Sequence, residues 1–216
     1  MKFTEGYWEK SERANASHAM QAFIVEEIPN GMQIVAPFHI ITDRSGALDV
    51  GTITIEFTAI RKDVISVRSW HFEGYQRKEP RFELNKDMQD VDVEITDEKA
   101  IMTAGRMQVC VDRKDFKIEY KADGKVLTTC GFRNIGYMQY DRSNSTKFPE
   151  SNYMYSDYTP YMNTELSLAP GECVYGMGER FTSFVKNGQV VDCWNEDGGT
   201  ASQISYKNIP FYMTNK

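Results

Sequence analysis

The sequence lacks any long apolar run, and this absence excludes whole classes of protein. No stretch approaches the roughly 18 apolar residues of a transmembrane helix. The first ten residues contain no apolar segment of the kind found in secretory signals. No block of Lys and Arg is present, and the formal net charge is −6. We therefore expect a cytoplasmic protein with no membrane partner and no nucleic-acid partner.

Cysteine and histidine are also scarce. The four cysteines form no CxxC pair, and the three histidines have no ligand-like spacing with them. This pattern predicts reduced thiols and no metal site. The pair Gly176-x-Gly178 precedes no helix signal, so it does not indicate phosphate binding, and we expect no cofactor.

Helix signals are few, whereas strand signals are many. The helix candidates are short polar stretches such as residues 10–16. Residues 52–58 and 90–96 alternate polar and apolar side chains, which predicts strands with one buried face. Further strands are expected at residues 20–26, 32–36, 64–72, 100–104, 107–112, 116–120 and 125–129.

Three turn dipeptides separate strand-like runs: Asn30-Gly31, Asp123-Gly124 and Asn187-Gly188. Such pairs suit type I′ hairpin turns, because both central residues need a positive φ. They predict a meandering antiparallel sheet, and the strands are too many for one open sheet. No internal repeat or low-complexity linker is visible. We therefore expect a single all-β domain built as a two-sheet antiparallel β-sandwich.

Residues 141–163 differ in composition, because they carry the tyrosines Tyr153, Tyr155, Tyr158 and Tyr161. Flat aromatic rings can stack on sugar faces, so one interpretation is a carbohydrate-binding platform. The other is a long loop that half-buried tyrosines hold against the sandwich.

The segment from Trp194 to Gly199 combines an aromatic ring, an amide, adjacent carboxylates and two glycines. Glu196 and Asp197 point to opposite sides of an extended chain, so they cannot form the carboxylate pair of a glycosidase. We therefore expect no catalytic residue here. Asp197 is the preferred ligand contact, because a carboxylate can accept two sugar hydroxyls, and the glycines that follow permit close approach.

Each candidate in this region also has a structural interpretation. Asp197 could be a turn residue before glycine, and Trp194 could lie in a core or at its rim. Glu179 and Arg180 could brace the loop or reach a ligand. The apolar run at 209–216 reads as a strand at the very end of the sequence, so we expect a piece of a larger protein.

Four sequence runs near the C-terminus strongly resemble glycoside hydrolase family 31, and within it the bacterial α-xylosidase branch. The ending at residues 207–215 is the most branch-specific part. A weaker match at residues 80–93 and 134–137 is collinear, so the resemblance covers the whole chain. The four runs are residues 174–181, 186–189, 194–200 and 206–215.

The resemblance implies that residues 1–216 form the N-terminal, galactose-mutarotase-like β-sandwich of a larger hydrolase. In the family, a (β/α)₈ barrel carries both catalytic aspartates of a retaining mechanism, and that barrel is absent from this sequence. The N-terminal domain lends one loop to the barrel. By position, Asp197 would contact the sugar, whereas Trp194, Asn195, Gly198 and Gly199 would shape the loop. Glu196 stands where relatives can have a basic residue, so no role is carried over to it.

The implied function is that of one part of an α-xylosidase or α-glucosidase. Its partners would be an oligosaccharide with α-linked xylose and its own C-terminal barrel, and the 216 residues alone are expected to be inactive. The alternatives are a stand-alone carbohydrate-binding sandwich and a purely structural module.

Overall fold

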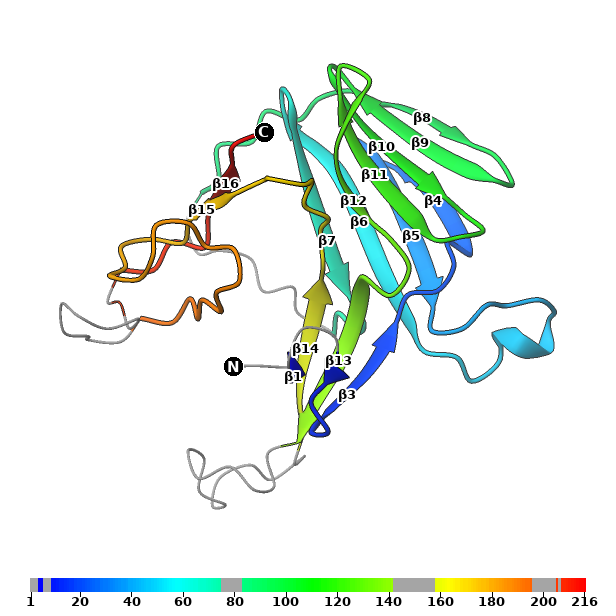
Figure 1. Cartoon of the computed structure of the whole chain (residues 1–216). Helices are drawn as coiled ribbons and strands as arrows, with labels where there is room; N and C mark the ends of the chain where they lie inside the picture. Colours follow the sequence, from blue (N-terminus) through cyan, green and yellow to red (C-terminus); the bar gives the residue numbers. More distant parts are fainter. Residues whose placement is uncertain (1–3, 6–8, 75–82, 142–157, 196–204, 206) are drawn as a thin grey trace. The chain divides into compact units, whose positions relative to one another are not determined.

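The computed structural model describes residues 4–5, 9–74, 83–141, 158–195, 205 and 207–216. They belong to two compact units (Figure 1). We call Glu12–Ser167 the sandwich unit, and Met1–Ser11 with Leu168–Lys216 the terminal unit. The organisation of the chain as a single domain stays a prediction.

The strands of the sandwich unit are β3 (Ala14–His18), β4 (Ile24–Ile28), β5 (Gly31–Pro37), β6 (Thr52–Arg61), β7 (Val64–Trp70), β8 (Asp92–Ile95), β9 (Lys99–Ala104), β10 (Met107–Asp112), β11 (Lys117–Ala122), β12 (Lys125–Cys130), β13 (Ile135–Asp141) and β14 (Tyr158–Thr164). Those of the terminal unit are β1 (Thr4–Glu5), β2 (Glu9–Lys10), β15 (Val174–Gly176) and β16 (Tyr212–Thr214). Helical structure in the described part of the chain is one 3₁₀ turn, Ser45–Ala47, so no described helix could span a membrane.

Three sheets build the sandwich unit. Their strand orders are β4-β5-β6-β7, β12-β11-β10-β9-β8 and β14-β13-β3. Neighbouring strands pair antiparallel throughout these sheets. The predicted all-β antiparallel sandwich is therefore confirmed.

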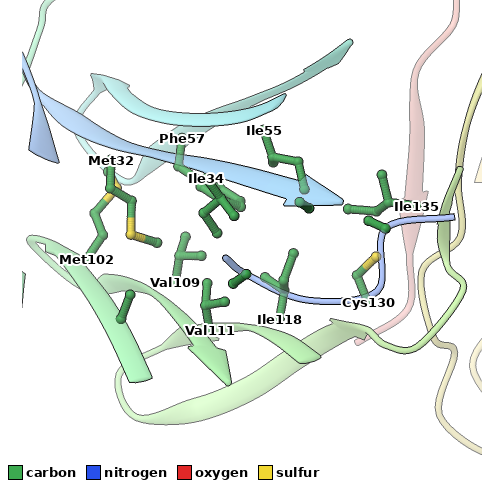
Figure 2. Packing of buried hydrophobic residues seen from close by; sticks show 14 of the residues in the cluster. Met32, Ile34, Ile55, Phe57, Met102, Val109, Val111, Ile118, Cys130 and Ile135 are labelled. Carbon is green, nitrogen blue, oxygen red and sulfur yellow. The ribbon is translucent and has the colours of Figure 1, made fainter. Parts of the chain in front are cut away.

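The alternation read from the sequence explains the core. Ile53, Ile55 and Phe57 of β6 are fully buried, whereas the residues between them are partly exposed. Figure 2 shows Ile55 and Phe57, together with apolar side chains of β5, packed against the labelled apolar side chains of β9, β10 and β11. Each fully buried side chain of this size contributes about 1.5 to 3 kcal/mol, so this interface holds the two sheets together.

Two of the predicted hairpin turns show how closely local sequence specifies geometry. Asp123 and Gly124 both have positive φ, 49° and 76°, as a type I′ turn requires. The expected Asn30-Gly31 turn is displaced by one residue. Gly31 pairs with Ile28, so the two residues of the turn are Pro29 and Asn30. Gly31 is instead required for close packing, since a Cβ there would lie 1.9 Å from the Phe57 carbonyl oxygen.

Some elements were predicted wrongly or missed. Residues 14–18 form strand β3 rather than a helix, and β13 was not predicted. The expected loop at 141–163 contains strand β14, where Tyr161 is half-buried. Pro160 argued against a strand in the sequence, but β14 lies at a sheet edge, where proline is tolerated. Tyr153 and Tyr155 lie outside the described residues.

Candidate functional site

The predicted sugar-contact segment is only partly described. Trp194 and Asn195 are described, whereas Asp197, Gly198 and Gly199 lie outside the described residues, so their roles stay predictions. The Trp194 side chain is not in a core, because 72% of the residue's surface is exposed.

The two flanks of residues 196–204 lie side by side. Asn195 and Ser205 form an isolated parallel β-bridge, which brings the beginning and the end of the segment together. Ser205 is only 5% exposed. Its hydroxyl donates to the Glu179 carbonyl oxygen at 2.6 Å and accepts from the Lys207 backbone N–H at 3.1 Å. The C-terminal flank is therefore anchored in the terminal unit.

Asn208 connects both flanks through one side chain. Its Nδ2 lies 2.6 Å from the Trp194 carbonyl oxygen, 2.8 Å from the Ser205 carbonyl oxygen and 3.0 Å from Asn195 Oδ1. Its backbone N–H also donates to Asn195 Oδ1, at 3.1 Å. On the other side, Asn208 Oδ1 accepts a hydrogen bond from Arg180 Nη2.

Arg180 holds the Asn208 side chain in place and is itself held by backbone carbonyl oxygens. Its Nε donates to the Met177 carbonyl oxygen at 3.0 Å, and its Nη2 lies 2.7 Å from the Asp192 carbonyl oxygen. The guanidinium group thus joins the turn after β15, the approach to Trp194 and the side chain of Asn208. Of the two interpretations of Arg180, the structure supports bracing.

The Gly176-x-Gly178 pair serves close backbone packing. Gly176, Met177 and Gly178 have positive φ values of 111°, 69° and 82°. A Cβ would lie 2.5 Å from the Phe211 carbonyl oxygen at Gly176, and 2.7 Å from the Lys207 carbonyl oxygen at Gly178. The glycines therefore let residues 207–211 cross this turn, where the Met177 N–H donates to Phe211 at 2.7 Å.

A second asparagine supports the opposite side of β15. Asn187 Oδ1 accepts from the Val174 N–H at 2.8 Å, and its Nδ2 donates to the Glu172 carbonyl oxygen at 2.9 Å. A turn is present at Asn187-Gly188, because the Gln189 N–H donates to the Lys186 carbonyl oxygen at 3.0 Å. Gly188 has a φ of 72° but Asn187 has no positive φ, so the turn is not of the expected type I′. Residues 183–185 and 190–191 are not strands, however, so this turn does not close the predicted hairpin.

Glu172 ties the start of the terminal unit to its last strand. The Ala169 N–H donates to its carboxylate at 2.7 Å. This hydrogen bond lowers the pKa of the Glu172 carboxyl most, and a second hydrogen bond, with the Thr214 side chain, lowers it further.

The described residues contain no cluster of three or more His, Cys, Asp or Glu side chains that could hold a metal ion.

Sequence reasoning did not single out Asn208 or Ser205. Each is a single polar residue with no motif of its own, next to glycine-rich and aromatic runs that resemble a binding site. The available signal was their position: Asn208 and Ser205 closely follow the candidate loop, where polar side chains can satisfy loop carbonyls.

Comparison with known proteins shows the family to which the chain belongs. The family described as "Glycosyl hydrolase 31 N-terminal galactose mutarotase-like domain" matches residues 54–216. The alpha-xylosidase XylQ of Lactiplantibacillus pentosus is 35% identical over 99% of this chain and 26% of its own length. An alpha-xylosidase of Emericella nidulans is 35% identical over 99% of this chain and 28% of its own length. The chain thus spans about a quarter of these relatives.

Solved structures share the fold. The cycloalternan-forming enzyme of Listeria monocytogenes matches 93% of this chain and 17% of its own, with a TM-score of 0.65 and 14% identity. A glycoside hydrolase family 31 dextranase of Flavobacterium johnsoniae matches 91% of this chain and 21% of its own, with a TM-score of 0.63 and 14% identity. By sequence and by fold, this chain belongs to the N-terminal galactose-mutarotase-like domains of glycoside hydrolase family 31, with α-xylosidases among its relatives.

Proposed function

We propose that this chain is one part of a retaining α-glycosidase that acts on oligosaccharides with α-linked xylosyl or glucosyl units. The observation that carries the proposal is the 35% identity with two α-xylosidases along 99% of the chain, although the chain covers only 26% and 28% of them. Retaining hydrolysis needs two carboxyl groups about 5 to 5.5 Å apart. In this proposal, the pair belongs to the barrel of the longer enzyme.

The contribution of this chain is a substrate-contact segment. Asp197 accepts hydrogen bonds from sugar hydroxyls at or beside the glycone position, and Trp194, Asn195, Gly198 and Gly199 shape the approach. The hydrogen bonds that hold Asn195 and Ser205 support this role, because a segment whose flanking residues are held in place loses less conformational entropy when it binds.

The second partner is the catalytic barrel itself. The terminal unit exposes large apolar side chains, including Phe181, Phe184, Ile209, Phe211 and Met213. Apolar surface of this kind is typical of a contact with another domain or protein. In this proposal, the barrel covers part of it and receives the segment that carries Asp197.

Kinetics on the longer enzyme test the proposal. Asp197→Ala should cost about 2 to 4 kcal/mol of transition-state binding in kcat/KM for p-nitrophenyl α-xyloside. The adjacent carboxylate is the matched control, and Glu196→Ala should leave kcat/KM close to the wild-type value. An Asp197→Ala enzyme with unchanged kcat/KM would instead indicate a structural module.

The isolated chain provides a second test. The purified 216 residues should release no p-nitrophenol, because the catalytic carboxylates lie in the barrel. Titration with a xylose-bearing oligosaccharide should likewise show little binding. Clear saturable binding by the isolated chain would favour the stand-alone carbohydrate-binding module instead.

A further inference from the structure

We propose that Asn208 is a positioning residue for the sugar contact made by the segment that begins at Trp194. This inference rests on the proposed function, because it concerns how that segment is held. It arises from one observation: a single amide side chain contacts both flanks of residues 196–204.

The contacts of Asn208 span the two flanks. Before the segment, Nδ2 reaches the Trp194 carbonyl oxygen and Asn195 Oδ1, at 2.6 and 3.0 Å. After it, Nδ2 reaches the Ser205 carbonyl oxygen at 2.8 Å. Three acceptors share the two N–H groups of one amide, so a change of this side chain removes a hydrogen bond from both flanks at once, while the β-bridge between Asn195 and Ser205 remains.

Arg180 determines which way the amide points. Its guanidinium group donates to Asn208 Oδ1, so the NH₂ group must face the acceptors on the two flanks. A hydrogen bond from a cation also polarises the amide, which strengthens the bonds that its N–H groups donate. Arg180 is itself held by the carbonyl oxygens of Met177 and Asp192.

Asn208 acts through the segment rather than on the substrate. Its side-chain oxygen and both N–H groups are already engaged by protein partners. Asp197 lies only two residues after Asn195, so the position of that flank limits where its carboxylate can be placed. A displacement of about 1 Å in a positioning element can cost about 100-fold in rate.

Two substitutions in the longer enzyme test the inference. Asn208→Ala removes all side-chain hydrogen bonds. Asn208→Asp keeps the size and the acceptor for Arg180 but removes the amide donors, so it tests the proposal even if the alanine variant folds poorly. Both should lower kcat/KM for p-nitrophenyl α-xyloside about 10- to 100-fold, with a raised KM.

Asn187 offers a matched control. It bridges backbone groups in the same unit but touches neither flank, because its partners are Val174 and Glu172. Asn187→Ala should also lower the melting temperature, although by less than Asn208→Ala, because it removes two side-chain hydrogen bonds rather than four. Its KM and kcat per folded enzyme should stay within about twofold of wild type. Equal kinetic effects of the two substitutions would overturn the positioning role.

A double-mutant cycle separates this inference from the proposed function. If Asn208 acts through Asp197, Asp197→Ala with Asn208→Ala should be within about twofold of Asp197→Ala alone. Fully additive losses would overturn the role of Asn208. If Asp197→Ala lowers kcat/KM but neither Asn208 variant does, only the positioning role fails. If Asp197→Ala has no effect, the proposed function fails first and this inference fails with it.

Discussion

Gly178→Ala separates backbone strain from steric contact at the candidate site, and Gly188→Ala is its matched control. Both glycines lie in the terminal unit with similar φ values, 82° and 72°. A Cβ at Gly178 would lie 2.7 Å from two backbone atoms, Ile209 N and the Lys207 carbonyl oxygen. A Cβ at Gly188 would meet no atom within 4 Å.

The magnitude follows from these distances. Alanine in the left-handed region costs about 1 to 2 kcal/mol, and both variants incur this cost. Ordinary van der Waals contact begins near 3.4 Å, so residues 207–209 must move by about 0.7 Å (3.4 − 2.7) to admit the new methyl group at Gly178. Overpacking of this kind adds about 1 to 3 kcal/mol. Gly178→Ala should therefore be the more destabilising variant by at least about 1 kcal/mol.

Urea unfolding of the purified chain, followed by circular dichroism, measures this difference. In the longer enzyme, Gly178→Ala should also lower kcat/KM, because the displaced residues include Asn208, whereas Gly188→Ala should not. Equal losses of stability in the two variants would refute the reasoning, since they would show that residues 207–209 yield without cost.

Two further predictions concern the sandwich and the thiols. Burial raises the pKa of the Cys130 thiol to about 12, whereas Cys193 is exposed. Iodoacetamide at pH 8 should therefore modify Cys193 in the folded chain and Cys130 only after unfolding. Peptide mass spectrometry of the folded and unfolded chain measures this difference. Hydrogen bonds from Lys117 and Lys121, at 2.7 and 2.9 Å, lower the pKa of Glu119 from 4.5 to about 2. The stability that Glu119 contributes is thus complete above pH 4.5 and is lost as the pH falls through 2. Glu119→Gln should cost no more than about 1 kcal/mol at pH 7 in urea unfolding, and a difference that grows on acidification would contradict this assignment.

The sequence was most informative where structure depends on neighbouring residues. Alternation along residues 52–58 correctly identified the buried face of β6, because successive side chains of a strand point to opposite faces. Asp123-Gly124 correctly predicted a hairpin turn, because its geometry needs two residues that tolerate positive φ. The C-terminal sequence runs also identified the family.

Other features depended on partners distant in sequence. The need for glycine at position 31 follows from the approach of β6, and β14 follows from its pairing with β13 despite Pro160. Neither partner can be read from the residues on either side. The same limit applied to the site, where composition drew attention to Trp194 and Asp197 but not to Asn208.

The sequence by itself therefore determined the all-β class, the alternating core and the family. These depend on periodicity and motif, which are properties of adjacent residues. Only the tertiary structure showed that Asn195 and Ser205 meet and that Asn208 joins both flanks. The bonds from Asn208 to Trp194 and Asn195 span 14 and 13 residues. Such bonds form only when the chain folds back on itself, which no local pattern specifies.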